Sequence, residues 1–175
     1  MDLKSQLERH LRGLEKLALS IPGFKGYKEK EIRREADRLL RQHVASVLEE
    51  ARGLLQETQI MVMQRGKIGL LDDLERAVMK LQNTADRLRT ASYGYSGFFD
   101  AVKIREEELD ALYDFDLSLL GKAEALVAAA KGLKEAAGGG EELLPLINQI
   151  ISEADALMDT FLRRQEAVIN FKGEG

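Results

Sequence analysis

Apolar residues recur every three or four positions through most of the chain, and this spacing predicts a protein built from α-helices. The first such stretch runs from about Leu3 to Ser20, with Asp2 as its N-cap. Its apolar side chains form one stripe, which consists of Leu3, Leu7, Leu11, Leu14 and Ala18. The helix should end at Ile21-Pro22-Gly23, because a residue that precedes proline avoids the α conformation.

The same periodicity predicts four more helices. Their expected ranges are Lys28 to about Gln64, Leu70 to Thr90, Phe98 or Phe99 to Lys131, and Glu141 to Phe171. The end of the second helix has an alternative, since residues 60–69 also read as a short hairpin, but helix is the preferred interpretation. Gly132 and the glycines at 138–140 are expected to form a flexible link.

Short connections between these helices predict an all-α, up-down antiparallel helical bundle of about five helices. At 175 residues the chain suits a single domain, which we place at residues 1–171, with a frayed tail at 172–175. Residues 23–27 resemble residues 94–98 in their Gly and aromatic pattern. That similarity suggests a helix hairpin used twice.

Two Gly-rich connections hold six of the ten aromatic residues, namely Phe24, Tyr27, Tyr93, Tyr95, Phe98 and Phe99. In an antiparallel bundle the connection after the first helix and the one after the third fall at the same end. Aromatic side chains dominate both core burial and interfaces. These loops are therefore expected either to plug the end of the bundle or to form a contact surface.

Several polar side chains fall within or beside the apolar arcs of the second and fourth helices: Arg33, His43, Arg105, Tyr113 and Asp116. A buried charge needs a partner. The sequence therefore predicts that Asp116 meets Arg33 or His43, and that Arg105 meets a carboxylate such as Glu35. The preferred interpretation is a set of structural pairs that fix helix register, and the alternative is a ligand or catalytic site.

Composition narrows the range of functions. The net charge of −4 disfavours a general nucleic-acid binder. No cysteine is present, which excludes thiolate chemistry and suits a reducing compartment, and neither a signal peptide nor a membrane span is apparent, so we expect a cytoplasmic protein. The paired Glu-x-x-His units of carboxylate-bridged metal bundles are missing from the sequence. No metal or cofactor is therefore predicted.

The sequence favours a non-enzymatic helical module that displays its aromatic loops to an unidentified protein partner. The wide apolar arc of residues 141–171 should pack against two neighbouring helices or against another subunit, and we expect a homodimer through that helix, by coiled-coil-like packing. The alternative function is a binder of a small anionic or amphipathic molecule, or an enzyme, with a polar site between the second and fourth helices. A third possibility is a helical protein associated with a membrane surface.

Overall fold

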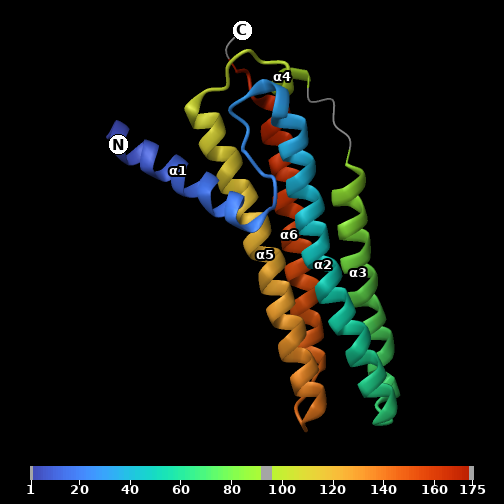
Figure 1. Ribbon diagram of the computed structural model, residues 1–175. Coiled ribbons are helices and arrows are strands. Elements are labelled where there is room, and N and C mark those ends of the chain that lie inside the picture. Colours follow the sequence, from blue (N-terminus) through green and yellow to red (C-terminus); the bar gives the residue numbers. More distant parts are fainter. Residues whose placement is uncertain (1, 92–95, 174–175) are drawn as a thin grey trace. The chain divides into compact units, whose positions relative to one another are not determined.

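The computed structural model describes residues 2–91 and 96–173, and every regular element in this part is helical. The helices are α1 (Leu3–Ser20), α2 (Arg33–Gln64), α3 (Leu71–Thr90), α4 (Ser96–Phe99), α5 (Glu106–Gly138) and α6 (Leu144–Asn170), as Figure 1 shows. Single turns of 3₁₀ helix at Lys30–Ile32 and Ile68–Leu70 lead into α2 and α3. The prediction of an all-α helical bundle is confirmed, and the up-down order of the whole chain stays a prediction.

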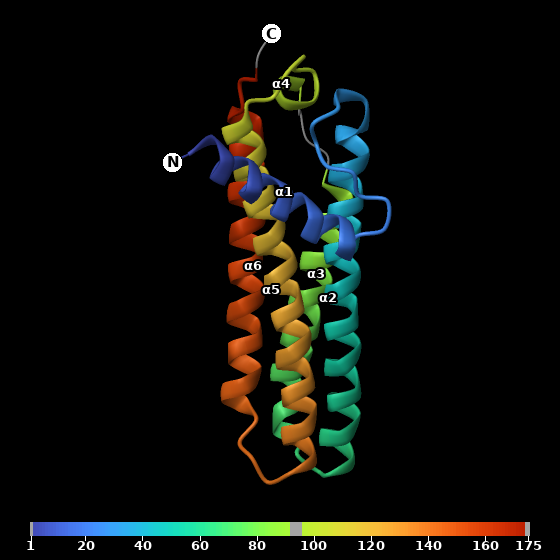
Figure 2. The ribbon, with the colours of Figure 1, turned by 60° about the vertical axis from the view of Figure 1, so that its left-hand side comes forward.

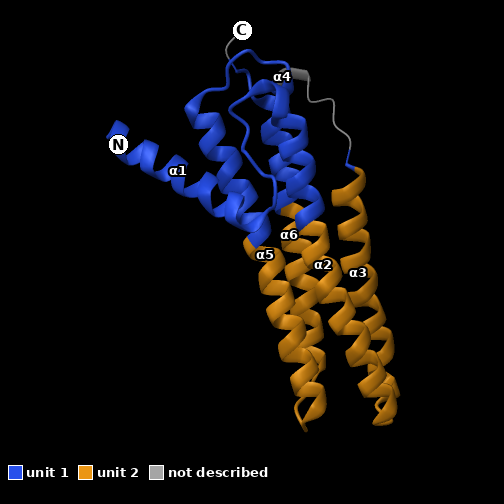
Figure 3. Ribbon diagram, viewed as in Figure 1, with its two compact units in different colours: residues 1–43, 91–120, 160–175 blue, residues 44–90, 121–159 orange. Residues whose placement is uncertain are grey.

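The chain divides into two compact units, coloured separately in Figure 3. Unit 1 comprises residues 1–43, 91–120 and 160–175, and unit 2 comprises residues 44–90 and 121–159. Three helices, α2, α5 and α6, contribute residues to both units. The organisation of residues 1–171 as a single domain stays a prediction.

Within unit 2, α2 and α3 run antiparallel. Arg89 binds Glu49 at 3.2 Å, and Gln59 binds Glu75 at 2.8 Å, so residue numbers rise along one helix as they fall along the other. The chain reverses at Gly66, whose φ of +75° is a conformation that glycine adopts without strain. The helix continues to Gln64 before this turn, which confirms helix over the hairpin alternative.

Within unit 1, α1 has the bounds that the sequence predicts, and its C-terminal half lies against α5 (Figure 2). The side that α1 buries is made by His10, Gly13 and Leu17. Gly13 permits a close approach, because a Cβ atom built there would lie 3.4 Å from Tyr113 Cβ. The buried side of α1 is therefore rotated from the predicted leucine stripe.

The segment between α1 and α2 is longer than the sequence predicts, because α2 begins at Arg33 and not at Lys28. Gly23 and Gly26 have φ values of +81° and +85°, which turn the chain out of helical geometry. A Cβ atom at Gly26 would lie 2.4 Å from Tyr113 Oη. Glycine at this position therefore lets the segment pack directly against α5.

The fourth predicted helix differs most from the observed one. α5 begins at Glu106, not at Phe98 or Phe99, because Phe98 and Phe99 belong to the single turn α4 and residues 100–105 are not helical. Glu108 favours the observed start by accepting a hydrogen bond from the Arg105 N–H at 3.3 Å, an arrangement like a capping box.

The far end of α5 also corrects the sequence prediction. The helix passes through Gly132 and ends at Gly138, since an exposed glycine costs a helix only about 1 kcal/mol and the flanking Leu133 is buried. α6 then begins at Leu144, with Pro145 in its first turn, where a missing N–H costs little. Lys172 and Gly173 of the predicted tail donate their N–H groups to Glu108, and residues 174–175 lie outside the described part.

Candidate functional sites

The aromatic side chains of the two Gly-rich connections pack inside unit 1. Phe24, Tyr27, Phe98 and Phe99 are at most 4% exposed. The two connections meet where the Tyr27 and Phe98 rings lie 5.9 Å apart, and Phe24 lies 5.6 Å from Tyr27. These four side chains are therefore a packed plug and not a displayed contact surface, which corrects that part of the prediction. Tyr93 and Tyr95 lie outside the described residues. Gly94 does too, so part of the suggested repeat also falls outside them.

A charged cluster lies beneath this plug and joins α2, α5 and α6. Arg164 donates to Asp116 at 2.7 Å through Nε and to Asp37 at 2.8 Å through Nη2. Tyr27 Oη donates to Asp116 at 2.5 Å, and Arg41 binds Asp37 at 2.9 Å. We call Tyr27, Asp37, Arg41, Asp116 and Arg164 the buried cluster. Its two arginines balance its two aspartates, which is the condition under which buried charges are tolerated.

Asp116 thus pairs with Arg164 and Tyr27, and not with Arg33 or His43 as the sequence predicts. Arg33 is fully buried but binds backbone carbonyl oxygens. Its acceptors belong to Tyr27 (2.8 Å), Ala101 (2.7 Å), Phe98 (3.2 Å) and Lys28 (3.4 Å). The guanidinium therefore ties the α1–α2 connection to the segment around α4.

The remaining predicted polar residues divide into two groups. Tyr113 is buried beside the cluster and accepts a hydrogen bond from the Tyr27 N–H at 3.2 Å. His43 is half-buried, and Arg105 is exposed because it precedes α5 and lies outside the helical arc assumed for it. Glu35, the expected partner of Arg105, pairs with Arg38 on its own helix. The structure therefore brings together Arg33, Tyr113 and Asp116 only.

Burial sets the protonation behaviour of this region. It raises the pKa of Tyr27 well above its ordinary value and that of Tyr113 to about 12, so both phenols stay neutral. It also raises the pKa of Asp116 to about 6, because desolvation outweighs the attraction of Arg164. These groups are enclosed and bonded to one another, an arrangement that suits fixing helix register better than acid-base chemistry on a substrate.

The raised pKa of Asp116 predicts a pH dependence of stability. The folded protein binds this proton with a pKa of about 6 and the unfolded chain with the ordinary value of 3.8. The folded state holds more protons between these values, so this contribution is complete below about pH 4 and is lost as the pH rises through about 6. Asp116→Asn removes the titration. We expect the stability of the wild type relative to this variant to rise by about 2 kcal/mol from pH 7 to pH 4.

Urea denaturation of both proteins at the two pH values measures this difference, and carboxyl groups that contact neither Asp116 nor Arg164 cancel in the comparison. A difference that stays constant, or that falls towards pH 4, would contradict the assignment of the raised pKa to Asp116.

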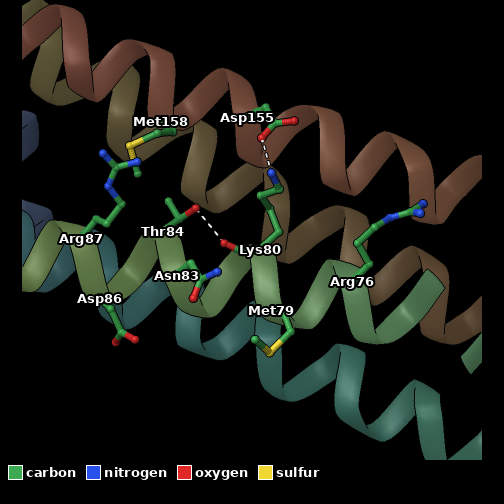
Figure 4. A pocket seen from close by; sticks show the side chains of 9 residues that line it. All are labelled: Arg76, Met79, Lys80, Asn83, Thr84, Asp86, Arg87, Asp155 and Met158. Carbon is green, nitrogen blue, oxygen red and sulfur yellow. Dashed lines mark hydrogen bonds and ion pairs between the residues drawn. The ribbon is translucent and has the colours of Figure 1, made fainter. Parts of the chain in front are cut away.

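An open groove of about 640 Å³ lies within unit 2, and its walls are formed by α3 and α6 (Figure 4). Arg76, Lys80 and Arg87 line it from α3, and Asp155 and Met158 line it from α6. Lys80 is paired with Asp155 at 2.9 Å, and Arg76 with Asp73 at 3.2 Å. The groove is open to solvent and its cations are largely matched by carboxylates, so it does not define a class of ligand.

The N-terminal half of α1 presents the clearest unpartnered surface in unit 1. Leu3, Leu7 and Leu11 recur every four residues along one face and are 82%, 54% and 52% exposed. We call these three leucines the α1 face. Figure 1 shows the N-terminal end of α1 pointing away from α5, and the buried residues of the helix begin at His10.

Two polar contacts hold α1 on α5 in this position. His10 Nδ1 lies 3.0 Å from Asp110 Oδ1, and the His10 ring stacks edge-on against Tyr113 at 5.0 Å. Arg9 pairs with Asp114 on the exposed side of the contact. The acidic residues of α5 therefore serve to position α1.

Sequence reasoning missed three members of the buried cluster: Asp37, Arg41 and Arg164. A signal for Arg164 was present, because it continues the buried spacing of Leu157 and Phe161 toward Val168 at steps of three and four residues. The sequence does not predict the partners of Arg164, because Asp116 and Asp37 lie on other helices, 48 and 127 positions away.

No protein-family model matches the chain, and neither the curated proteins nor the solved structures contain a match. Within residues 2–91 and 96–173, no helix has the length and apolar character needed to cross a membrane. The same described part contains no group of three or more His, Asp or Glu side chains placed to hold a metal ion.

Proposed function

We propose that this chain is a non-enzymatic helical interaction module that binds an amphipathic helix of a protein partner through the α1 face. The observation that supports the proposal is the row of three leucines, each more than half exposed, on a helix whose other end is packed. A helix normally buries such a stripe. Leucines at this spacing are also the anchors by which paired helices recognise each other.

The attachment of α1 to α5 supports a docking role. Leu17 and Gly13 are buried, and the contacts of His10 with Asp110 and of Arg9 with Asp114 hold the helix in place. The surface is thus formed before a partner arrives. Binding then avoids the entropic cost of ordering a flexible segment.

Charges beside the α1 face favour a protein over a lipid surface. Lys4, Glu8, Arg12 and Glu15 are exposed and carry balanced charges. A helix that lies on an anionic membrane has a predominantly basic polar face. Alternating charges instead provide specificity toward a complementary protein surface.

The ligand-binding alternative receives less support from the buried residues. Arg33, Tyr113 and Asp116 are at most 2% exposed and are bonded to other groups of the protein. A ligand would have to displace these bonds and separate buried charges, each step costing several kcal/mol. We therefore prefer the interaction module.

A photo-crosslinking amino acid at position 11 tests the proposal in living cells. We expect Leu11 to be replaced without loss of folding and to give protein adducts, because the side chain is 52% exposed on the α1 face. Position 169 is the matched control, since Ile169 is 57% exposed and lies on α6. Adducts should require Leu3 and Leu7, and Leu3→Ser together with Leu7→Ser should remove most of them. Mass spectrometry of the adducts is the measurement.

Lipid adducts at position 11, or protein adducts no more abundant than those at position 169, would contradict the proposed module.

A further inference from the structure

The α1 face and the charged edge beside it are complementary to a second copy of themselves. We propose that α1 of one chain packs antiparallel on α1 of a second copy, with the two Leu11 side chains near the two-fold axis. This inference rests on the proposed function, since it names the occupant of the α1 face.

The leucine spacing matches an antiparallel two-fold pair. In such a pair the numbers of two facing residues have a nearly constant sum, because one helix ascends as the other descends. With Leu11 facing Leu11, Leu7 faces Leu14 of the second copy and Leu3 faces Ala18. Leu14 is half-buried and Ala18 is exposed in the single chain, so both retain surface that a second helix would cover.

The charges agree with the same arrangement. At about 100° per residue, Lys4, Glu8, Arg12 and Glu15 follow one edge of the α1 face. A two-fold axis perpendicular to antiparallel helices brings this edge of one copy beside the same edge of the other. Lys4 then lies within about one helical turn of Glu15, and Glu8 within about one turn of Arg12, distances that these long side chains can span, and each pair occurs twice.

These charged groups are available for a second copy. Within the described part of the chain, Lys4, Glu8 and Glu15 make no side-chain ion pair. Arg12 donates Nε to the Glu8 carbonyl oxygen at 3.2 Å, which leaves the Glu8 carboxylate free.

The opposite edge of α1 argues against a parallel pair. A parallel two-fold pair would bring the charged edge of one copy against the opposite edge of the other. That edge includes His10 and Gly13, which α5 already covers. The antiparallel arrangement uses only surface that remains accessible.

The contact would be small. A helix of 18 residues is about 27 Å long, so two crossing copies bury less than the roughly 1,600 Å² of a standard stable interface. We therefore expect weak, concentration-dependent self-association of the full chain.

Disulfide trapping tests the geometry, because the chain contains no cysteine and an introduced one is unique. In the full chain, Leu11→Cys should form a disulfide-linked dimer under mild oxidation, since the two positions meet at the axis. Leu3→Cys is the control, because its two copies would be about 23 Å apart. Equal or faster trapping through position 3, or no trapping through position 11, would overturn the antiparallel pair.

Charge exchange tests recognition independently. Lys4→Glu with Arg12→Glu makes the edge wholly acidic, and Glu8→Lys with Glu15→Lys makes it wholly basic. Each double variant alone should self-associate at least about tenfold more weakly than the wild type by analytical ultracentrifugation. An equimolar mixture should regain association as a heterodimer. Wild-type self-association by either variant alone, or a mixture that stays monomeric, would overturn the pairing.

The two proposals fail in different ways. A wild-type chain that stays monomeric at millimolar concentration, while position 11 crosslinks to another protein in cells, would disprove self-pairing and leave the module intact. Absence of protein adducts from position 11 in cells, together with a monomeric chain, would disprove both.

Discussion

Replacing Arg164 by methionine is expected to destabilise the protein by about 3–5 kcal/mol, the cost of leaving buried charges without their partner. Arg164 is fully buried and bridges Asp116 and Asp37. Methionine fills much of the same volume but removes the guanidinium that is paired with Asp116. Urea denaturation followed by circular dichroism measures the loss.

Arg163→Met is the matched control, since Arg163 is the exposed neighbour on the same helix. Its substitution should change stability by no more than about 0.5 kcal/mol. Adding Asp116→Asn to Arg164→Met should recover part of the loss, because it removes the uncompensated carboxylate. A loss equal to that of Arg163→Met would show that the buried cluster does not stabilise the fold.

Replacing Arg33 by methionine is expected to cost about 3–4 kcal/mol, because backbone carbonyl oxygens lose their donor inside the protein. Arg33 binds the carbonyls of Tyr27 and Ala101 at 2.8 and 2.7 Å, and two more at longer distance. The same denaturation experiment measures the loss, and hydrogen exchange of residues 21–29 should rise with it.

Two variants define the cause of that effect. Arg33→Lys should recover less than half of the stability, since one ammonium group does not reproduce the planar fork of a guanidinium. Arg38→Met should have little effect, because Arg38 pairs with Glu35 on the exposed side of α2. Full rescue by lysine would show that charge, and not the carbonyl contacts, explains the role of Arg33.

Local sequence signals predicted the helix bounds well where no long-range contact changed them. The bounds of α1 follow from the leucine spacing and Ile21-Pro22, within the same stretch of chain, although the side chain of the N-cap residue Asp2 makes no capping hydrogen bond. The predicted start of α5 was wrong because Phe98 and Phe99 fit a helical pattern in the sequence. In the structure, hydrogen bonds of Arg33 and Glu108 stabilise a non-helical segment before Glu106.

The candidate site illustrates a similar division. Burial of Arg33 and Asp116 follows from their positions within apolar arcs, and so does the need for a partner. The identity of the partner does not follow. Arg33 donates to backbone carbonyl oxygens such as that of Tyr27, and Asp116 accepts from Arg164, which is 48 residues distant in sequence.

By itself the sequence determined the helical class of this protein, most of its helix bounds and the requirement that its buried charges be neutralised, because each depends on neighbours within a few turns. Only the tertiary structure decided that the aromatic loops fill the interior of unit 1 and that three leucines of α1 stay exposed. The exposure of the leucines depends on how far α1 is rotated against α5, which is set at Gly13 and His10 by contacts with residues one hundred positions away. The burial of the aromatic loops depends on contacts between the two connections, such as that of the Tyr27 ring with the Phe98 ring.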